Sequence, residues 1–274
     1  MIGELLTNPI DTIIFFLLAM PGRLIAISCH EWGHAWMANR CGDPTARLMG
    51  RMTINPLAHL DPFGFLMMIV AGFGWAKPVP VNPNNFRNYR KDDLKVSLAG
   101  ITMNILLFLL GCTVMYTIVG MALYKASFNT FRDAYYITEY LGEMVFVIDG
   151  SYIPMDMLIE YAPYISEFLI GGVFGEVTMY VYQMLMYFTL TNLVLAIFNL
   201  IPVPPLDGFH VLDDIILHKT RFRMTYKAQQ TLSAVLIILV VTGATGEIIG
   251  FFQDIVFGAV GNVATAVFTG IGLI

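Results

Sequence analysis

Long apolar stretches dominate this sequence and restrict the folds that it can adopt. An α-helix rises about 1.5 Å per residue, so roughly 20 apolar residues cross a hydrocarbon core about 30 Å thick. The apolar stretches lie at about Ile10–Asn39, Phe63–Ala76, Val96–Tyr124, Val177–Ile201, Leu232–Val241 and Ile248–Ile274. They predict an all-α polytopic membrane protein with about five to six transmembrane helices. The stretch Phe63–Ala76 is short and glycine-rich, and we expect it to be re-entrant.

The composition agrees with a multi-pass membrane protein. Hydrophobic residues make up 57% of the chain and charged residues only 13%, about half of the roughly 25% charge in soluble domains. The net charge is -5 and the basic residues form no stripe on a polar face, which argues against a nucleic-acid partner. We expect a single membrane-embedded domain over residues 1–274, with a core in 10–215 and C-terminal helices in 228–274.

The loop charges predict an orientation in the cell membrane. Lysine and arginine cluster in residues 77–95 and again in 213–228, whereas residues 133–176 contain neither. Cytoplasmic loops carry an excess of these two residues. We therefore expect both basic loops on the cytoplasmic side of the bilayer and residues 125–176 on the opposite side.

The motif His30-Glu31-Trp32-Gly33-His34 lies in the last third of the first apolar stretch. Residues four apart share one face of a helix, so both imidazoles can bind one metal ion. Neutral imidazole is a good zinc ligand, and Glu31 can reach a zinc-activated water as general base. Three ionisable groups within five residues of a membrane helix are costly unless they have a function.

A catalytic zinc site needs a third protein ligand and an open position. Asp207 is one candidate, because three prolines break the chain between the fourth apolar stretch and this residue. Broken backbone at membrane depth is tolerated only where protein buries it or where it lines a wet cavity. On the residues alone, Asp207 competes with His59, His210 and Asp213.

HEWGH in an apolar helix, followed far downstream by NLIPVPPLDG, resembles the site-2 protease family of intramembrane zinc metalloproteases. The resemblance extends to GRMTINPLAHLDPFG (50–64), AKPVPVNPNNF (76–86) and SLAGITMN (97–104), and it is strongest with the compact prokaryotic branch that lacks PDZ and CBS domains. It implies that His30, His34 and Asp207 bind zinc and that Glu31 is the base. It also implies that Asn104 is catalytic and holds the substrate carbonyl or oxyanion.

A period-two pattern follows the first helix. Leu48, Gly50, Met52 and Ile54 alternate with Arg47, Met49, Arg51 and Thr53. Such alternation predicts a small β-hairpin or edge strand over about 45–55. We expect Gly50, Arg51, Met52, Thr53 and Ile54 to bind an unwound substrate by strand addition.

The predicted function is hydrolysis of peptide bonds within or near transmembrane segments of other membrane proteins in the lipid bilayer, with one Zn²⁺ per chain and the active site near the cytoplasmic side. Two alternatives belong to other classes. A metal transporter would need several polar relay residues along a pore, and an inactive relative would be expected to lack Glu31 or Asp207. Both of these residues are present.

Overall fold

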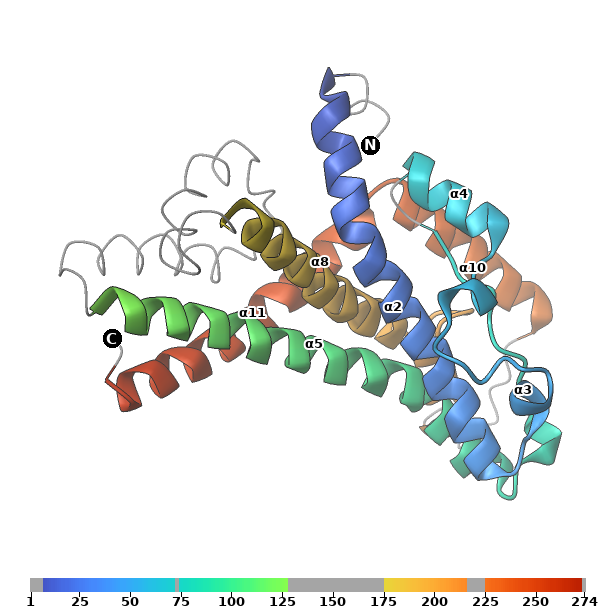
Figure 1. Cartoon of the computed structure of the whole chain (residues 1–274). Helices are drawn as coiled ribbons and strands as arrows, with labels where there is room; N and C mark the ends of the chain where they lie inside the picture. The colour runs from blue at the N-terminus through green and yellow to red at the C-terminus, as the bar shows by residue number, and fades with distance from the viewer. Residues whose placement is uncertain (1–6, 72–73, 128–174, 216–224, 273–274) are drawn as a thin grey trace.

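The computed structural model describes residues 7–71, 74–127, 175–215 and 225–272 (Figure 1). The described part is mostly helical and contains no β-strand. The prediction that residues 125–176 lie on the side of the bilayer opposite the cytoplasm concerns residues that are largely outside this described part. In chain order its helices are α2 (Pro9–Cys41), α3 (Thr45–Leu48), η1 (Pro56–Ala58), α4 (Pro62–Ala71), η2 (Pro83–Asn85), α5 (Tyr89–Ser127), α8 (Gly175–Leu200), α9 (Asp207–Ile215), α10 (Tyr226–Val241) and α11 (Ala244–Gly270).

Four of the described helices are long and apolar enough to cross a membrane, namely α2, α5, α8 and α11. The apolar helix α10 has 16 residues, a length of about 24 Å that falls short of the hydrocarbon core. The apolar helix α4 has ten residues, about 15 Å, so it cannot cross as a helix. Within the described residues, the number of spanning helices is therefore smaller than the five to six predicted.

Helices α2, α5 and α8 pack directly on one another and form the centre of the protein (Figure 1). Small residues allow the close approach that is typical of membrane helices. A Cβ on Gly22 of α2 would lie 2.8 Å from the backbone of Phe188 on α8, and one on Gly33 would lie 3.0 Å from the Ala99 carbonyl oxygen on α5. These crossings bring the C-terminal part of α2 against the N-terminal part of α5.

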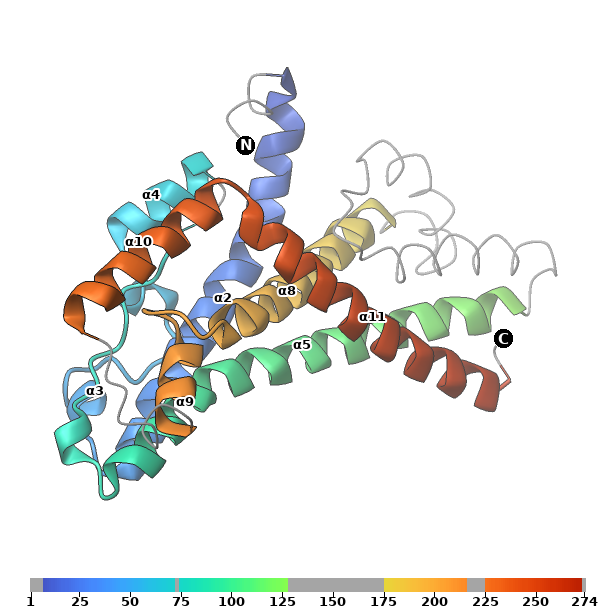
Figure 2. The same ribbon diagram turned by 180° about the vertical axis from the view of Figure 1, so that it is seen from behind.

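The remaining helices pack around this centre. From α11, Val256, Phe257 and Val260 pack on a buried cluster of Phe108, Cys112 and Leu193 from α5 and α8. Helix α9 lies against the beginning of α5 and the end of α8 (Figure 2). The ends of α2 and α8 and the start of α5 therefore meet in one region.

The predicted hairpin over 45–55 is wrong. Thr45–Leu48 forms the short helix α3, and the chain then turns at Gly50, whose φ of +67° lies in the left-handed region. The physical reason lies just before the pattern, where the buried carboxylate of Asp43 accepts hydrogen bonds from the Thr45 amide and hydroxyl. Asp43 also accepts from the Asn82 amide and the Asn85 side chain, so it fixes a local turn and joins two loops.

Candidate metal centre

Helix α2 carries both motif histidines on one face. The two Nε2 atoms lie 3.0 Å apart, and both side chains are about nine-tenths buried. The helix continues to Cys41 and ends at Gly42, which adopts the left-handed conformation with φ of 112°. The histidines therefore lie inside a long apolar helix, more than one turn before its end.

Asp207 reaches the same point from the other end of the sequence. Helix α8 ends at Leu200, the Pro-rich segment 201–206 turns the chain, and Asp207 begins α9. Its Oδ2 atom lies 3.3 Å from Nε2 of His30 and 3.3 Å from Nε2 of His34.

The spacing of these three side chains fits a zinc ion. Zn–N and Zn–O bonds of about 2.0–2.1 Å in tetrahedral geometry place neighbouring ligand atoms about 3.3 Å apart. The observed separations are 3.0, 3.3 and 3.3 Å. Asp207 Oδ2 is buried and has no hydrogen-bond partner, which leaves it available to a cation. In the described part of the chain, no other group of three His, Cys, Asp or Glu side chains has ligand spacing.

The second ring nitrogen of each histidine is held by a partner. His34 Nδ1 donates to the Val96 carbonyl oxygen on α5 at 2.8 Å, and His30 Nδ1 donates to Asn104 Oδ1 at 2.6 Å. Both contacts place the proton on Nδ1 and leave the Nε2 lone pair for a metal. Metal-binding histidines are commonly oriented in this way.

Gly100 of α5 lies directly against the rings of His30 and His34. A Cβ at this position would lie 2.4 Å from His34 Nε2 and 2.7 Å from His30 Cε1. Any side chain here would occupy the space of the two imidazoles, so α5 can approach α2 at the metal centre only with glycine. Sequence reasoning missed Gly100 as a site residue, although it lies within the SLAGITMN motif.

Glu31 is buried beside the histidines and makes one contact that sequence reasoning also missed. Its Oε2 atom accepts a hydrogen bond of 2.7 Å from the Val79 amide. Proline has no backbone N–H group. Val79 lies between Pro78 and Pro80, so its amide is the one backbone donor of this tripeptide. The amide therefore holds one oxygen of the carboxylate and leaves the other for chemistry.

The other candidate ligands lie apart from this centre. His59 Nε2 donates to the Thr53 carbonyl at 2.7 Å, and Asp213 is exposed. His210 Nδ1 lies 3.4 Å from the Asp93 carboxylate, which raises the pKa of His210. The geometry therefore favours Asp207 among the four candidates.

The structure places Asn104 behind His30, where its amide has no free donor. Its Nδ2 group donates to the Ala26 carbonyl at 3.2 Å and to Asn192 Oδ1 at 3.0 Å, and its side chain is fully buried. Both amide protons are used in this way. The predicted contact of Asn104 with a substrate oxyanion has no support in this geometry.

The expected substrate-binding residues 50–54 lie beside the segment that contacts Glu31. The Arg51 guanidinium donates to the carbonyl oxygens of Lys77 and Pro78 at 2.8 and 3.2 Å. Farther along, Leu60 and Ala76 form an isolated antiparallel bridge. Arg51 therefore holds the backbone next to Val79 and is not free to bind substrate with these donors.

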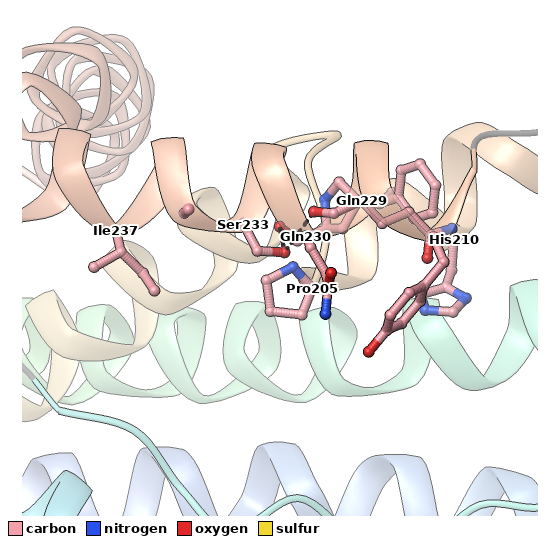
Figure 3. A pocket seen from close by; sticks show the side chains of 10 residues that line it. Pro205, His210, Gln229, Gln230, Ser233 and Ile237 are labelled. Atoms are coloured by element: carbon pink, nitrogen blue, oxygen red, sulfur yellow. Dashed lines mark hydrogen bonds between the residues drawn. The ribbon is translucent and has the colours of Figure 1, made fainter.

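A cavity of about 550 Å³ adjoins the segment that carries Asp207. Gln230 and Ser233 of α10 lie opposite Pro205 across it (Figure 3). The Ser233 hydroxyl donates to the Pro204 carbonyl at 3.0 Å, so α10 is tied to the chain just before the third ligand.

Comparison with known proteins agrees with this site. The profile described as peptidase family M50 matches residues 15–243, which include all three candidate ligands and Glu31. The chain belongs to peptidase family M50. The family includes the site-2 proteases, so the resemblance drawn from the motifs is confirmed, and the M50 chain is a zinc metalloprotease.

Two relatives named as putative zinc metalloproteases illustrate the match. YwhC of Bacillus subtilis (strain 168) is 32% identical over 219 residues, 80% of this chain and 78% of the relative. Rip2 of Mycolicibacterium smegmatis is 33% identical over 113 residues, 39% of this chain and 43% of the relative. No solved structure matches this chain.

Proposed function

We propose that this M50 chain is an intramembrane endopeptidase that cuts other membrane proteins within or near their transmembrane segments. The observation that carries the proposal is the depth of the candidate ligands. His34 lies seven residues before the end of α2, which has the length and hydropathy of a membrane span. Seven residues correspond to about 10 Å of helix, which supports a metal centre that a substrate would reach from within the membrane.

The charge distribution supports an active site near the cytoplasmic side of the cell membrane. Arginine side chains are frequent where α2 ends and α5 begins, the same end at which the candidate ligands lie. An excess of arginine and lysine marks cytoplasmic loops. These residues are Arg40, Arg47, Arg51, Arg87 and Arg90.

The proposed mechanism assigns a role to each side chain. His30, His34 and Asp207 would hold zinc, which when bound would acidify the attacking water and polarise the scissile carbonyl. Glu31 accepts the proton of that water on the oxygen that Val79 leaves free, and then delivers it to the leaving amine. The nine-tenths burial of Glu31 limits exchange of this proton with bulk solvent.

The substrate must unwind before attack, because a helix protects its carbonyl groups with i to i-4 hydrogen bonds. We propose that residues 50–54 and the adjacent segment through Val79 receive the unwound chain. Exposed N–H and C=O groups of the substrate are costly to leave unpaired at membrane depth. Backbone contacts with an extended segment would satisfy them without requiring a particular side-chain sequence.

The metal-transporter alternative is less well supported. Within the described residues there is one three-ligand group, as expected for a resident metal, and a transport path would need more than one. A non-cleaving relative is also disfavoured, because the three candidate ligands lie within 3.3 Å of one another and the candidate base Glu31 is present next to His30.

The test is co-expression of the protein with a panel of tagged single-pass membrane proteins. Each substrate is expressed with wild type, with Glu31→Gln, or as a soluble fusion that lacks its transmembrane segment. The proposal expects fragments only with wild type and only from membrane-anchored substrates. Equal cleavage of the soluble fusions would contradict intramembrane action, and fragments produced by Glu31→Gln would contradict the mechanism.

A further inference from the structure

We propose that Asn192 of α8 is a positioning residue, which acts through Asn104 to fix the tautomer and the ring orientation of His30. The inference rests on the zinc site proposed above. It concerns metal affinity and does not depend on which protein is cut. Asn192 lies outside the motifs that predict the site, seven residues before NLIPVPPLDG begins at Asn199.

The side chains of Asn192, Asn104 and His30 form one hydrogen-bonded chain across three helices. Asn192 Nδ2 donates to the Phe188 carbonyl within α8 at 2.8 Å. Asn192 Oδ1 then accepts from Asn104 Nδ2 at 3.0 Å, and Asn104 Oδ1 accepts from His30 Nδ1 at 2.6 Å. Both asparagines are fully buried, so water does not compete for these groups.

The donor and acceptor roles in this hydrogen-bonded chain of side chains are fixed at both ends. The carbonyl oxygens of Phe188 and Ala26 can only accept hydrogen bonds, so the NH₂ group of each asparagine must face them. Asn104 Oδ1 then has to face His30, where it can only accept. The proton of the neutral imidazole is therefore held on Nδ1, and the lone pair is presented on Nε2.

The consequence for metal binding follows from the opposite orientation. If Asn104 turned its NH₂ group toward His30, Nδ1 would become the acceptor and the proton would move to Nε2. A protonated Nε2 cannot bind zinc. Asn192 opposes this rotation, because the rotated amide would place Asn104 Oδ1 against Asn192 Oδ1.

The expected effects are graded. Outer partners of metal-binding histidines typically change metal affinity by about 10–100-fold. Asn104→Leu removes the acceptor of His30 and should reduce zinc affinity toward the upper part of that range. Asn192→Leu leaves Asn104 with its contact to Ala26, so the loss should be nearer to tenfold.

The test measures zinc affinity by chelator competition on purified protein in detergent, together with thermal unfolding and the absorption spectrum of the Co²⁺ form. If Asn192 acts through Asn104, the double variant Asn104→Leu/Asn192→Leu should bind zinc no more weakly than Asn104→Leu alone. Asn192→Ala is measured in parallel and should reproduce Asn192→Leu, so the result does not depend on how leucine packs.

Two further variants separate positioning from packing. Thr189→Val is the matched control, because Thr189 is equally buried on α8 and its hydroxyl bonds only within that helix. It should leave zinc affinity and the Co²⁺ spectrum unchanged. Asn192→Asp should restore affinity, because a buried carboxyl is held neutral and can then donate to Phe188 and accept from Asn104.

The proposal is overturned if the losses from the Asn104 and Asn192 variants add, because Asn192 would then act by another route. It is equally overturned if Asn192→Leu and Asn192→Ala bind zinc as tightly as wild type, or if Thr189→Val loses as much affinity as they do. Each outcome is a measurement of metal binding, so it does not depend on which substrate the protease cuts.

Discussion

Replacement of Gly100 by alanine tests the geometry of the metal centre with a single methyl group. The new Cβ would lie 2.4 Å from His34 Nε2, whereas ordinary contact begins near 3.4 Å. The imidazole or helix α5 must therefore move by about 1 Å. Metal–ligand distances tolerate deviations of only about 0.2 Å, so His34 can no longer bind the ion together with His30 and Asp207.

We expect the zinc affinity of purified Gly100→Ala to fall by more than the roughly 10–100-fold that changes in the outer partners of metal-binding histidines cause. The assay is zinc content by elemental analysis, followed by chelator competition. Gly111→Ala is the control on the same helix, about 16 Å away, where the methyl would meet the Thr189 hydroxyl at 2.1 Å. It should lower thermal stability and keep its zinc. Wild-type zinc affinity in Gly100→Ala would refute the reasoning.

Four other variants test separate parts of the site. Asp207→Ala should lose zinc and His210→Ala should keep it, as measured by metal content; full retention in Asp207→Ala would remove that residue from the ligand set. Glu31→Gln should bind zinc normally and lose about 10²–10⁴-fold in cleavage rate, so near-normal turnover would exclude it as the base. Arg51→Gln should retain zinc and lower activity, because it releases the backbone beside Val79; unchanged cleavage would show that this clamp is dispensable.

The sequence predicts the part of the site that depends on local periodicity. His30 and His34 are one helical turn apart, so their shared face follows from helix geometry alone. Asp207 could not be separated from His59, His210 and Asp213 on residue type, because all four can bind metal and their distances depend on the fold. The family resemblance favoured Asp207, and packing of α8 and α9 against α2 and α5 brings it to the histidines.

The missed residues share one physical cause, because their roles come from contacts between distant segments. Gly100 matters through a helix crossing, Asn192 through a neighbour 88 positions away, and Val79 through an amide that points at Glu31. The predicted hairpin over 45–55 was wrong for a different reason. Its alternating pattern was local, but the side chain of Asp43 favours a helical turn at Thr45.

The most direct test of the account is the position of the cut. Purified protein and a single-pass substrate are reconstituted together in lipid vesicles, and the fragments are identified by mass spectrometry before and after removal of zinc by a chelator. The account predicts zinc-dependent cleavage within or next to the transmembrane segment, on the side near the cytoplasmic end. A cut confined to a soluble region far from the bilayer, or cleavage that persists without metal, would contradict it.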